Sequence, residues 1–552
     1  MPRRSAPATG VAHKRKERGY LMEFDYIIVG AGSAGCVLAN RLTERDDVTV
    51  LLLEAGGRDL HPLIHIPAGF MKTLTNRRVN WCYETEPEEH ANGRRIFFPR
   101  GKVLGGSSSI NGHLYIRGQQ QDYDTWAQMG NRGWSYDDVK PYFLKSENRE
   151  GGAGDQGFHG KGGPLNIADP RERHPISDAF IASAETLGIP RTNDSNGAQH
   201  DGAGYFDNAM KNGRRMSSAR AFLKPARKRA NLHVEVNALA ERIDFKDRRA
   251  VGVTYRQGDK QRTATARREV LLSGGTVNSP QLLQLSGVGP GAHLRAHGID
   301  VVHDVAGVGE NLQDHYMTRL SYRVKNAGSL NERSHGLRLV AEVAKYALFR
   351  RGLLAYGAGH VRLSVKSHPE QSIPDLQMGF TPGSYAGGQF GVLDPYPGMS
   401  CGVWVHRPDS RGRVTVKSAN PQEPPAIALN YLSELSDREA TVAGLKLCRQ
   451  IFHGQPLANI RDIEELPGDQ VSSDDEWLEY ARANGSTVYH CVGTCKMGTD
   501  PMAVVDPTLK VHGIDGLRVV DASIMPRVVS ANTNATVYMI AEKAADMIKA
   551  DQ

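Results

Sequence analysis

Long apolar runs and closely spaced cysteines are both missing from this sequence. No run of about 18 residues is free of polar side chains, whereas a helix needs about 20 apolar residues to cross a bilayer. The 6 cysteines in 552 residues are too few and too scattered for a disulfide framework. The N-terminal segment lacks the apolar stretch of a secretory signal. We therefore expect a cytoplasmic protein without a membrane span.

Excess positive charge is scarce outside one short segment. The net charge is +7, but six basic residues and one acid fall within residues 1–22, so the rest of the chain is nearly neutral. A protein that binds nucleic acid usually carries a basic patch on its folded surface. We expect residues 1–23 to be a disordered basic extension and expect no nucleic-acid partner.

Glycine, in contrast, is abundant. The sequence holds 59 glycines, where ordinary usage of about 7% would give about 39. Many turns, or places where backbone approaches a ligand, must need them. A chain of 552 residues also exceeds the size of about 250–300 residues at which one hydrophobic core stops growing, so at least two domains are expected.

The stretch FDYIIVGAGSAGCVLANRL (24–42) predicts a buried strand, a glycine turn and a helix. Gly30 allows the turn, Gly32 lets a pyrophosphate approach the backbone, and Gly35 lets the helix pack on the strand. A second strand over 48–53 ends at Glu54, where a carboxylate can bond a ribose hydroxyl and would repel the 2′-phosphate of NADP. These residues predict a dinucleotide site and leave NAD and FAD open.

Three further stretches extend this pattern. PRGKVLGGSSSINGHLYIRG (99–118) offers amides and hydroxyls to a large flat or anionic ligand. GGTVNSPQLLQLSGVG (274–289) predicts a helix capped by Asn278 or Ser279, with Pro280 in its first turn. STVYHCVGTCKMG (486–498) precedes a strand that ends at Asp521 and a long amphipathic helix over 530–548. The nucleotide fold is therefore expected to be assembled from both ends of the chain.

With these motifs the sequence resembles the glucose–methanol–choline (GMC) family of FAD oxidoreductases over about residues 24–548. Residues 101–118 and 275–289 match its two long signatures, and the C-terminal His-x-x-Gly-Thr-Cys-x-Met-Gly block follows in order. The resemblance implies an α/β fold: a Rossmann-like FAD-binding domain assembled from both chain ends, with an α+β substrate domain built on an antiparallel sheet. It also implies that the turn at Gly30 holds FAD.

The motif positions divide the chain in the following way. The FAD-binding domain is predicted to comprise residues 24–154, 226–314 and 486–552, the last part carrying the catalytic histidine. The substrate domain is predicted to comprise residues 155–225 and 315–485. Within it, LRLVAEVAKYALF (337–349) predicts an amphipathic helix, which we expect to pack on the domain core rather than on a membrane.

The resemblance also implies positions that contact FAD. Those predicted for the pyrophosphate turn and the adenosine are Gly30, Gly32, Ser33, Ala34, Gly35, Glu54 and Ala240. Those predicted for the ribityl chain and the flavin are Val103, Gly106, Ser107, Asn111, Gly112, His113, Leu114, Asp521, Ala522, Thr533 and Asn534. Ala240 stands where the family usually has valine. Ile110 occupies the place of a histidine that links FAD covalently in some relatives, so non-covalent binding is expected.

His490 matches the family's catalytic histidine. An imidazole that titrates near neutral pH can take a hydroxyl proton while hydride passes to flavin N5. Asn532 falls where relatives carry a second histidine or an asparagine; its amide can orient the alcohol oxygen but cannot share proton transfer. Asn534 competes with Asn532 for this assignment. Cys491 and Cys495 near His490 lack a fourth ligand, so no metal site is expected.

The predicted function is FAD-dependent oxidation of an alcohol at its CH–OH group, with a primary alcohol favoured, to the aldehyde. Molecular oxygen or another acceptor would reoxidise the flavin. The alternatives are a flavoprotein lyase of the hydroxynitrile-lyase type and a catalytically idle flavin-binding protein, although the latter would be expected to lack His490. Choline would need an anionic or aromatic cage, which no residue supplies recognisably. The alcohol, the acceptor and the oligomeric state stay undefined by the sequence.

Overall fold

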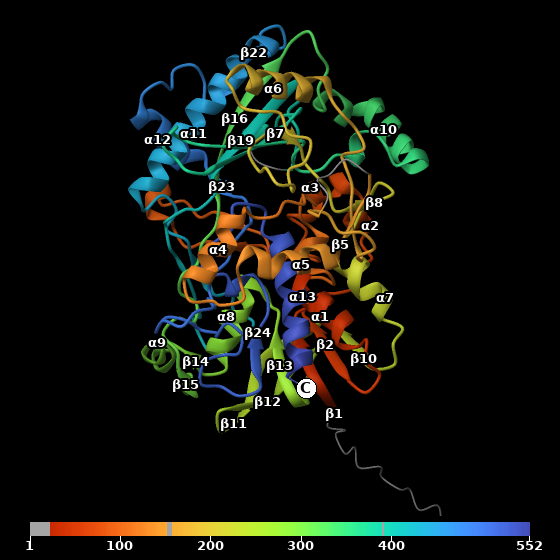
Figure 1. The fold of residues 1–552 in the computed structure, drawn as a ribbon, viewed down its shortest axis with the longest axis vertical. Coiled ribbons are helices and arrows are strands. Elements are labelled where there is room, and N and C mark those ends of the chain that lie inside the picture. Colours follow the sequence, from red (N-terminus) through yellow and green to blue (C-terminus); the bar gives the residue numbers. More distant parts are fainter. Residues whose placement is uncertain (1–21, 152–156, 389–390, 552) are drawn as a thin grey trace, which may run out of the picture.

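A largely parallel sheet, at the bottom of Figure 1, brings distant parts of the chain together. Its strands, in spatial order, are β10 (Leu232–Val236), β2 (Val50–Glu54), β1 (Met22–Val29), β13 (Lys260–Leu272), β12 (Arg249–Gln257) and β11 (Ala238–Lys246), with β24 (Leu517–Val519) also beside β13. β10, β2, β1, β13 and β24 run parallel, and β12 and β11 extend the sheet antiparallel. The apolar runs of β1 and β2 are almost wholly buried, as expected for parallel strands covered on both faces.

The computed structural model describes residues 22–151, 157–388 and 391–551. Residues 1–21 of the extension predicted over residues 1–23 therefore lie outside the described residues. Met22 and Glu23 correct that prediction, because they form the start of β1 and pair with Ala264 and Thr265 of β13.

Two helices from opposite chain ends pack beside this sheet. α1 (Ser33–Leu42) lies against α13 (Asn534–Ala550), the red and blue helices near the centre of Figure 1. The Arg41 guanidinium pairs with Glu542 at 2.8 Å. α5 (Tyr136–Ser146) packs on α13 as well. Both ends of the chain thus contribute to the same part of the fold, as predicted.

A second sheet, antiparallel throughout, forms the upper part of Figure 1. Its order is β22 (Arg461–Leu466), β16 (Tyr316–Val324), β19 (Gly398–Val405), β18 (Leu376–Thr381), β17 (Val361–Val365) and β7 (Gly202–Tyr205), with β23 (Ser486–Thr487) also beside β16. Its presence confirms the predicted fold class. The domain boundaries stay a prediction; β23 joins this second sheet although its residues fall in the range predicted for the FAD-binding domain.

The period-2 alternation of these strands separates two faces. Leu320, Met378 and Cys401 point to an apolar core shared with the helices α6 (Pro175–Thr186), α11 (Leu435–His453) and α12 (Asp474–Asn484). Arg319, which alternates with Leu320, and Trp404 are both buried and line a cavity instead. One face therefore provides the core and the other faces the interior between the two sheets.

Shorter elements connect these layers. The helices are α2 (Pro62–His65), α3 (Phe70–Thr73), α4 (Gln120–Gln128), α7 (Lys224–Ala226), α8 (Gly275–Leu285), α9 (Gly291–Ala296) and α10 (Gly336–Phe349). The small strand pairs are β3 (Tyr83–Glu84) with β4 (Phe97–Phe98), β5 (Glu147–Arg149) with β6 (Leu165–Ile167), β8 (Met210–Lys211) with β9 (Arg214–Arg215), β14 (Val288–Gly289) with β15 (His303–Asp304), and β20 (Arg413–Thr415) with β21 (Ala426–Ala428). No helix in the described ranges has both the length and the apolar content to cross a membrane.

Two local expectations are wrong. α8 begins at Gly275, directly after β13, so Asn278 and Ser279 lie inside its first turns and do not cap it. The Ser279 hydroxyl instead donates to Asp521 (2.6 Å). α10 forms where predicted, but of its residues only Tyr346 is buried, so it does not pack on the core with its apolar face. Periodicity defined that face but not the direction in which it points.

A half-buried histidine between two carboxylates makes the fold sensitive to pH. His159 lies between Glu147 (2.8 Å) and Asp194 (2.7 Å). Burial alone would lower its pKa, but the hydrogen bonds to the two carboxylates raise it from 6.5 to about 9. Because the folded pKa is raised, the stabilisation is complete below pH 6.5 and is lost as pH rises through about 9.

We predict that His159→Gln lowers the melting temperature most at about pH 6 and that this deficit shrinks above about pH 9, where the wild-type histidine is neutral. Thermal unfolding followed by circular dichroism across this range measures it. A deficit independent of pH would contradict the charged state of His159.

Candidate active site

One cavity of about 490 Å³ lies between the strand ends of the first sheet and the polar face of the second. Its volume is in the range of about 300–1,000 Å³ typical of small-molecule sites. Gly30, Ser33 and Glu54 line it from the first sheet and its connections, and Met317 and Trp404 line it from the second. Of the residues predicted to contact FAD or substrate, all line this cavity except Gly35 and Val103. Those two have packing roles.

The glycine turn has the geometry that the motif requires. Gly30 has φ +100°, and a Cβ there would lie 2.5 Å from the carbonyl oxygen of Ser273. A Cβ on Gly35 would lie 1.9 Å from the carbonyl oxygen of Gly30, so Gly35 lets the helix pack against the turn. The first turn of α1 lines the cavity, and a helix N-terminus favours an anionic phosphate.

Glu54 ends β2 beside this turn. Its carboxylate accepts hydrogen bonds from the amides of Ala31 (3.0 Å) and Gly56 (2.8 Å), so it also fixes the turn. Burial raises its pKa to about 7, although the two amide bonds oppose the shift. A carboxyl group has further lone pairs with which it can accept a ribose hydroxyl.

Arg215 supports the loop over residues 105–113 and was missed by the sequence analysis. Its buried guanidinium donates to Asn111 Oδ1 (2.6 Å) and to the carbonyl oxygen of Ile64 (2.8 Å). Burial lowers its pKa to about 9. Asn111 Oδ1 also accepts from the amide of His113 (3.0 Å), so one buried cation holds the loop that faces the cavity.

His113 provides the test of whether a polar ligand fits this part of the cavity. Its side chain is 2% exposed and lines the cavity. Neither ring nitrogen has a hydrogen-bond partner among the described residues. Burial, with the charge of Arg215, lowers its pKa well below the usual value, so the ring is neutral. Buried polar atoms are rarely left unpaired, and this pair of nitrogens is what a flavin or ribityl group would satisfy.

Hydrogen bonds define the tautomer of His490. His315 Nε2 lies 2.8 Å from the carbonyl oxygen of His406, which can only accept, so that nitrogen carries the proton. His315 Nδ1 is then an acceptor, and it lies 2.9 Å from His490 Nδ1. The proton of neutral His490 must therefore be on Nδ1, which leaves a lone pair on Nε2. Asn532 Nδ2 donates to that lone pair at 2.9 Å.

Burial keeps His490 neutral. It lowers the pKa of His490 well below its usual value, and the neighbouring His315 and Arg100 add to the effect. Burial also lowers the pKa of His315 to about 4. The pair is therefore uncharged at neutral pH, with His490 able to accept a proton at Nε2.

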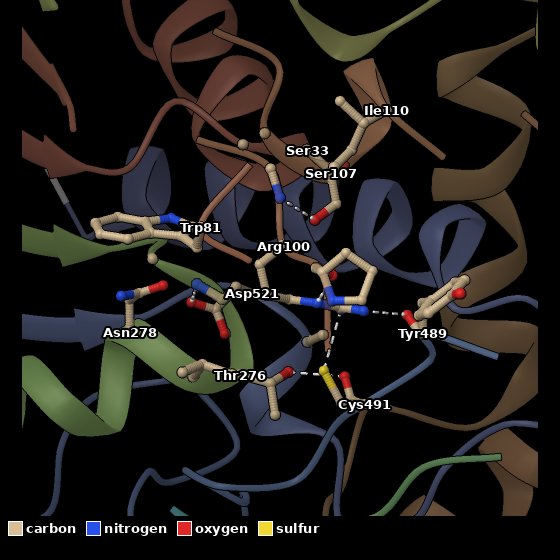
Figure 2. A pocket seen from close by; sticks show the side chains of 18 of the residues that line it. Ser33, Trp81, Arg100, Ser107, Ile110, Thr276, Asn278, Tyr489, Cys491 and Asp521 are labelled. Carbon is tan, nitrogen blue, oxygen red and sulfur yellow. Dashed lines mark hydrogen bonds between the residues drawn. The ribbon is translucent and has the colours of Figure 1, made fainter. Parts of the chain in front are cut away.

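Residues distant in sequence fix the segment that carries His490. Asp314 accepts from the amide of His490 (2.7 Å) and from the Tyr431 hydroxyl (2.6 Å). Figure 2 shows Arg100 reaching the carbonyl oxygen of Tyr489 (2.9 Å) and the sulfur of Cys491 (3.1 Å). Neither Asp314, His315 nor Arg100 was assigned from the sequence. Adjacent Asp314 and His315 before a strand were the available signal.

Cys491 is part of this packing. Thr276 Oγ1 donates to its carbonyl oxygen (2.8 Å; Figure 2), and burial raises the pKa of its thiol to about 11. In the described part of the chain, no three histidine, cysteine, aspartate or glutamate side chains are grouped so that they could hold a metal ion.

The two candidate asparagines lie in different surroundings. Asn532 contacts His490, and its Oδ1 is buried with no partner within the described ranges. Asn534, at the start of α13, accepts from the Ser33 hydroxyl (2.6 Å) at the phosphate turn. This geometry favours Asn532 as the partner of His490.

The second sheet lines the remaining part of the cavity. Met317 and Arg319 of β16, Gly379 of β18 and Trp404 of β19 contribute to it. The Trp404 ring lies 6.4 Å from that of His490, and the Arg319 guanidinium lies 4.9 Å from the Tyr385 ring. Among the described residues, the carboxylates that line the cavity are Glu54, Glu423 and Asp521, and none of them belongs to the second sheet.

A dinucleotide turn joined to a buried neutral histidine defines a nucleotide-dependent oxidoreductase with a dedicated substrate sheet. Family models of the GMC oxidoreductases match residues 24–317 and 408–541. The chain belongs to the GMC oxidoreductase family, which confirms the resemblance seen in the sequence.

Relatives cover nearly the whole chain. An alcohol dehydrogenase (acceptor) of Pseudomonas putida is 43% identical over 528 residues, which is 95% of either chain. An oxygen-dependent choline dehydrogenase of P. putida strain GB-1 is 44% identical and covers 96% of this chain and 94% of its own. Among solved structures, a formate oxidase aligns with a TM-score of 0.91 at 29% identity, and pyridoxine 4-oxidase from Mesorbium loti with 0.87 at 30%; both alignments cover 96% of this chain and 99% of the other.

The geometry of Gly30 gives a test with a matched control. Gly30 and Gly133 both have positive φ, at +100° and +84°, but a Cβ on Gly133 meets nothing within 4 Å. Both alanine substitutions incur the backbone cost of about 1–2 kcal/mol, and only Gly30→Ala adds the clash with Ser273. We predict a clearly larger loss in the free energy of unfolding for Gly30→Ala, measured by chemical denaturation. Equal losses would contradict the close contact.

Proposed function

We propose that this protein oxidises an alcohol to the aldehyde, with non-covalently bound FAD as hydride acceptor and His490 as general base. The observation that carries the proposal is the lone pair on His490 Nε2, fixed by the hydrogen bond to His315 and facing Asn532 at the cavity. The relatives named alcohol dehydrogenase and choline dehydrogenase support the same class of reaction. The relatives and structures named above include no lyase, so nothing supports the lyase alternative.

The residues present fit FAD along the length of the cavity. When bound, FAD supplies the acceptor for the hydride that leaves the alcohol carbon. The turn at Gly30 and the start of α1 would hold the pyrophosphate, and Glu54 the adenosine ribose. His113 and Asn111 would lie along the ribityl and flavin part, and Asp521 would face the phosphate. Buried Ile110 stands where a covalent link would need a histidine, which supports non-covalent binding.

The chain's own residues provide the proton transfer. A substrate hydroxyl would replace the Asn532 amide at His490 Nε2 and donate its proton there. The amide of Asn532, displaced from the lone pair, would then donate to the alcohol oxygen and orient the carbon. His315 keeps the other imidazole proton on Nδ1, so that Nε2 stays the accepting atom. Burial holds His490 neutral before the reaction, which is the state that a base requires.

The cavity supports an uncharged alcohol more than choline. A quaternary ammonium group is recognised by carboxylates or by a cage of aromatic rings. The substrate part is lined by Met317, Trp404, Leu114 and the cationic Arg319. Among the described residues no carboxylate of the second sheet faces it. A trimethylammonium group would therefore meet the like charge of Arg319 and would have only the rings of Trp404, Phe206 and Tyr489 to favour it.

Anaerobic bleaching of the flavin tests the reaction directly. We predict that neutral primary alcohols reduce the flavin and that choline reduces it far more slowly. His490→Ala should retain FAD, but alcohols should reduce its flavin about 10²–10⁴-fold more slowly than in the wild type, because a general base typically contributes that much. Acid precipitation confirms occupancy and should leave FAD in the supernatant. Full activity of His490→Ala, or FAD that stays with the precipitate, would contradict the proposal; reoxidation in air then identifies oxygen as an acceptor.

Asn532 and Asn534 provide a matched pair. Asn532→Ala removes the amide beside His490 and should slow flavin reduction, with the apparent pKa of the rate nearly unmoved because Asn532 does not titrate. Asn534→Ala removes the bond to Ser33 and should weaken FAD retention with a smaller effect on the reduction rate of the loaded protein. Stopped-flow absorbance at saturating alcohol measures both variants. The reverse pattern would mean that Asn534 orients the substrate.

A further inference from the structure

Helix α10 (Gly336–Phe349) presents apolar side chains to the outside of the molecule. Leu337 is 88% exposed, Val340 63%, Leu348 74% and Phe349 66%. Only Glu342 and Tyr346 of its residues are shielded by the rest of the protein. A surface helix of a globular protein ordinarily turns its apolar side chains inward and its polar ones outward. Here the arrangement is reversed, and Figure 1 shows the helix at the periphery of the upper half.

Specific contacts fix this orientation. The Tyr346 hydroxyl donates to the carbonyl oxygen of Gly213 (2.8 Å). Glu342, one turn earlier, accepts from Arg333 (2.8 Å) and from the amide of Leu353 (2.7 Å). At 3.6 residues per turn, Leu337, Val340 and Leu348 lie on the side of the helix opposite Glu342 and Tyr346. The apolar ridge is therefore held outward by polar bonds on the inner face.

The exposed surroundings of the ridge are basic. Arg338 and Lys345 are exposed on the helix, and exposed Arg351 follows it, whereas half-buried Arg350 lies over the Tyr346 ring (5.1 Å). The acid of this segment, Glu342, is turned inward to Arg333. An amphipathic helix with an apolar ridge and flanking Lys and Arg side chains is typical of a segment that lies in the interface of a bilayer.

We propose that α10 docks this protein on an anionic lipid surface. The apolar ridge would enter the boundary between headgroups and acyl chains, while Arg338, Lys345 and Arg351 would contact anionic headgroups. With 14 residues the helix is shorter than the ~20 needed to span, so the attachment is peripheral. A second copy fits this surface less well, because two such helices would bring their basic rims together.

The segment that follows α10 leads to the cavity wall. After α10 the chain runs through a 3₁₀ turn (Leu353–Ala355) to Ala358 and Gly359, which line the cavity beside Leu114. The cavity wall is thus within ten residues of the helix end. The inference does not depend on the proposed function, because it concerns binding to lipid and is measured without turnover.

Vesicle co-sedimentation with the purified full-length protein tests this inference. The vesicles are phosphatidylcholine alone, or phosphatidylcholine with about one third phosphatidylglycerol. The wild type should sediment with the anionic vesicles, and less so with neutral ones or when NaCl rises from about 0.05 M to about 0.5 M. Leu337→Glu/Leu348→Glu should lower the partition coefficient at least about tenfold, because it places two charges in the ridge.

Leu435→Glu/Ile463→Glu is the matched control, since these residues are 60% and 53% exposed and lie on other elements. It should bind vesicles like the wild type, and all variants should keep wild-type flavin content and circular dichroism. Wild-type protein that stays in the supernatant with anionic vesicles would overturn the proposal. An equal loss of vesicle binding in the control variant would overturn it as well. So would a wild-type dimer that Leu337→Glu/Leu348→Glu dissociates without changing vesicle binding, because that result would make α10 an interface between two copies of the chain.

Discussion

The packing of α1 against α13 is the contact on which the site depends. α1 follows the glycine turn at Gly30, and α13 begins two residues after Asn532, so their relative position sets the distance between the glycine turn and the His490–Asn532 pair. The Arg41–Glu542 ion pair and the Ser33–Asn534 hydrogen bond cross this contact from opposite ends of α1. Glu542 is fully buried and pairs with Arg41 of α1 (2.8 Å) and with Lys145 of α5 (3.6 Å), so separating the chain ends would remove the nearer of its two cationic partners. Burial of a charge that needs its partner makes this docking specific.

The second constraint is the chain of polar bonds behind His490. The carbonyl oxygen of His406, directly after β19, orients His315, and His315 in turn orients His490. Asp314, next to His315, holds the backbone of His490. Two neighbouring residues directly before β16 thus determine both the position and the tautomer of His490. These residues directly flank the strands β16 and β19, so the second sheet anchors the segments that hold His490.

Glycine spacing and apolar runs correctly predicted the features of the fold that depend on residues close together in the sequence. The turn at Gly30, the strand that ends at Glu54 and the joining of both chain ends follow from glycine spacing and apolar runs, and the structure has them. His315, Arg215 and Arg319 were not found, because each acts on residues far away in sequence; His315 and His490 are 175 positions apart. A single histidine or arginine in a strand carries no local signature of its partner.

The error at α10 has the same origin. The helical period of Leu337, Val340 and Leu348 defines a face but does not say what covers it, and the inward direction was assumed because most amphipathic helices bury their apolar side. The decisive residues were Glu342 and Tyr346, whose partners Arg333 and Gly213 are visible only in three dimensions. Periodicity predicted the helix correctly, whereas the tertiary hydrogen bonds of Glu342 and Tyr346 determine its orientation.

The two faces of the second sheet explain how a polar site is tolerated in the interior. Arg362, Gln377 and His406 are fully buried on the cavity side and keep polar atoms without partners among the described residues. Each such group costs about 1–3 kcal/mol when it is left unpaired. The opposite face of the same strands packs Leu320, Met378 and Val403 against α11 and its neighbours. Burial of those apolar side chains contributes about 1.5–3 kcal/mol each, which acts against this cost. Since alternate residues of one strand face opposite ways, substitutions on the cavity side can change the chemistry of the site without removing the apolar contacts that hold the sheet in place.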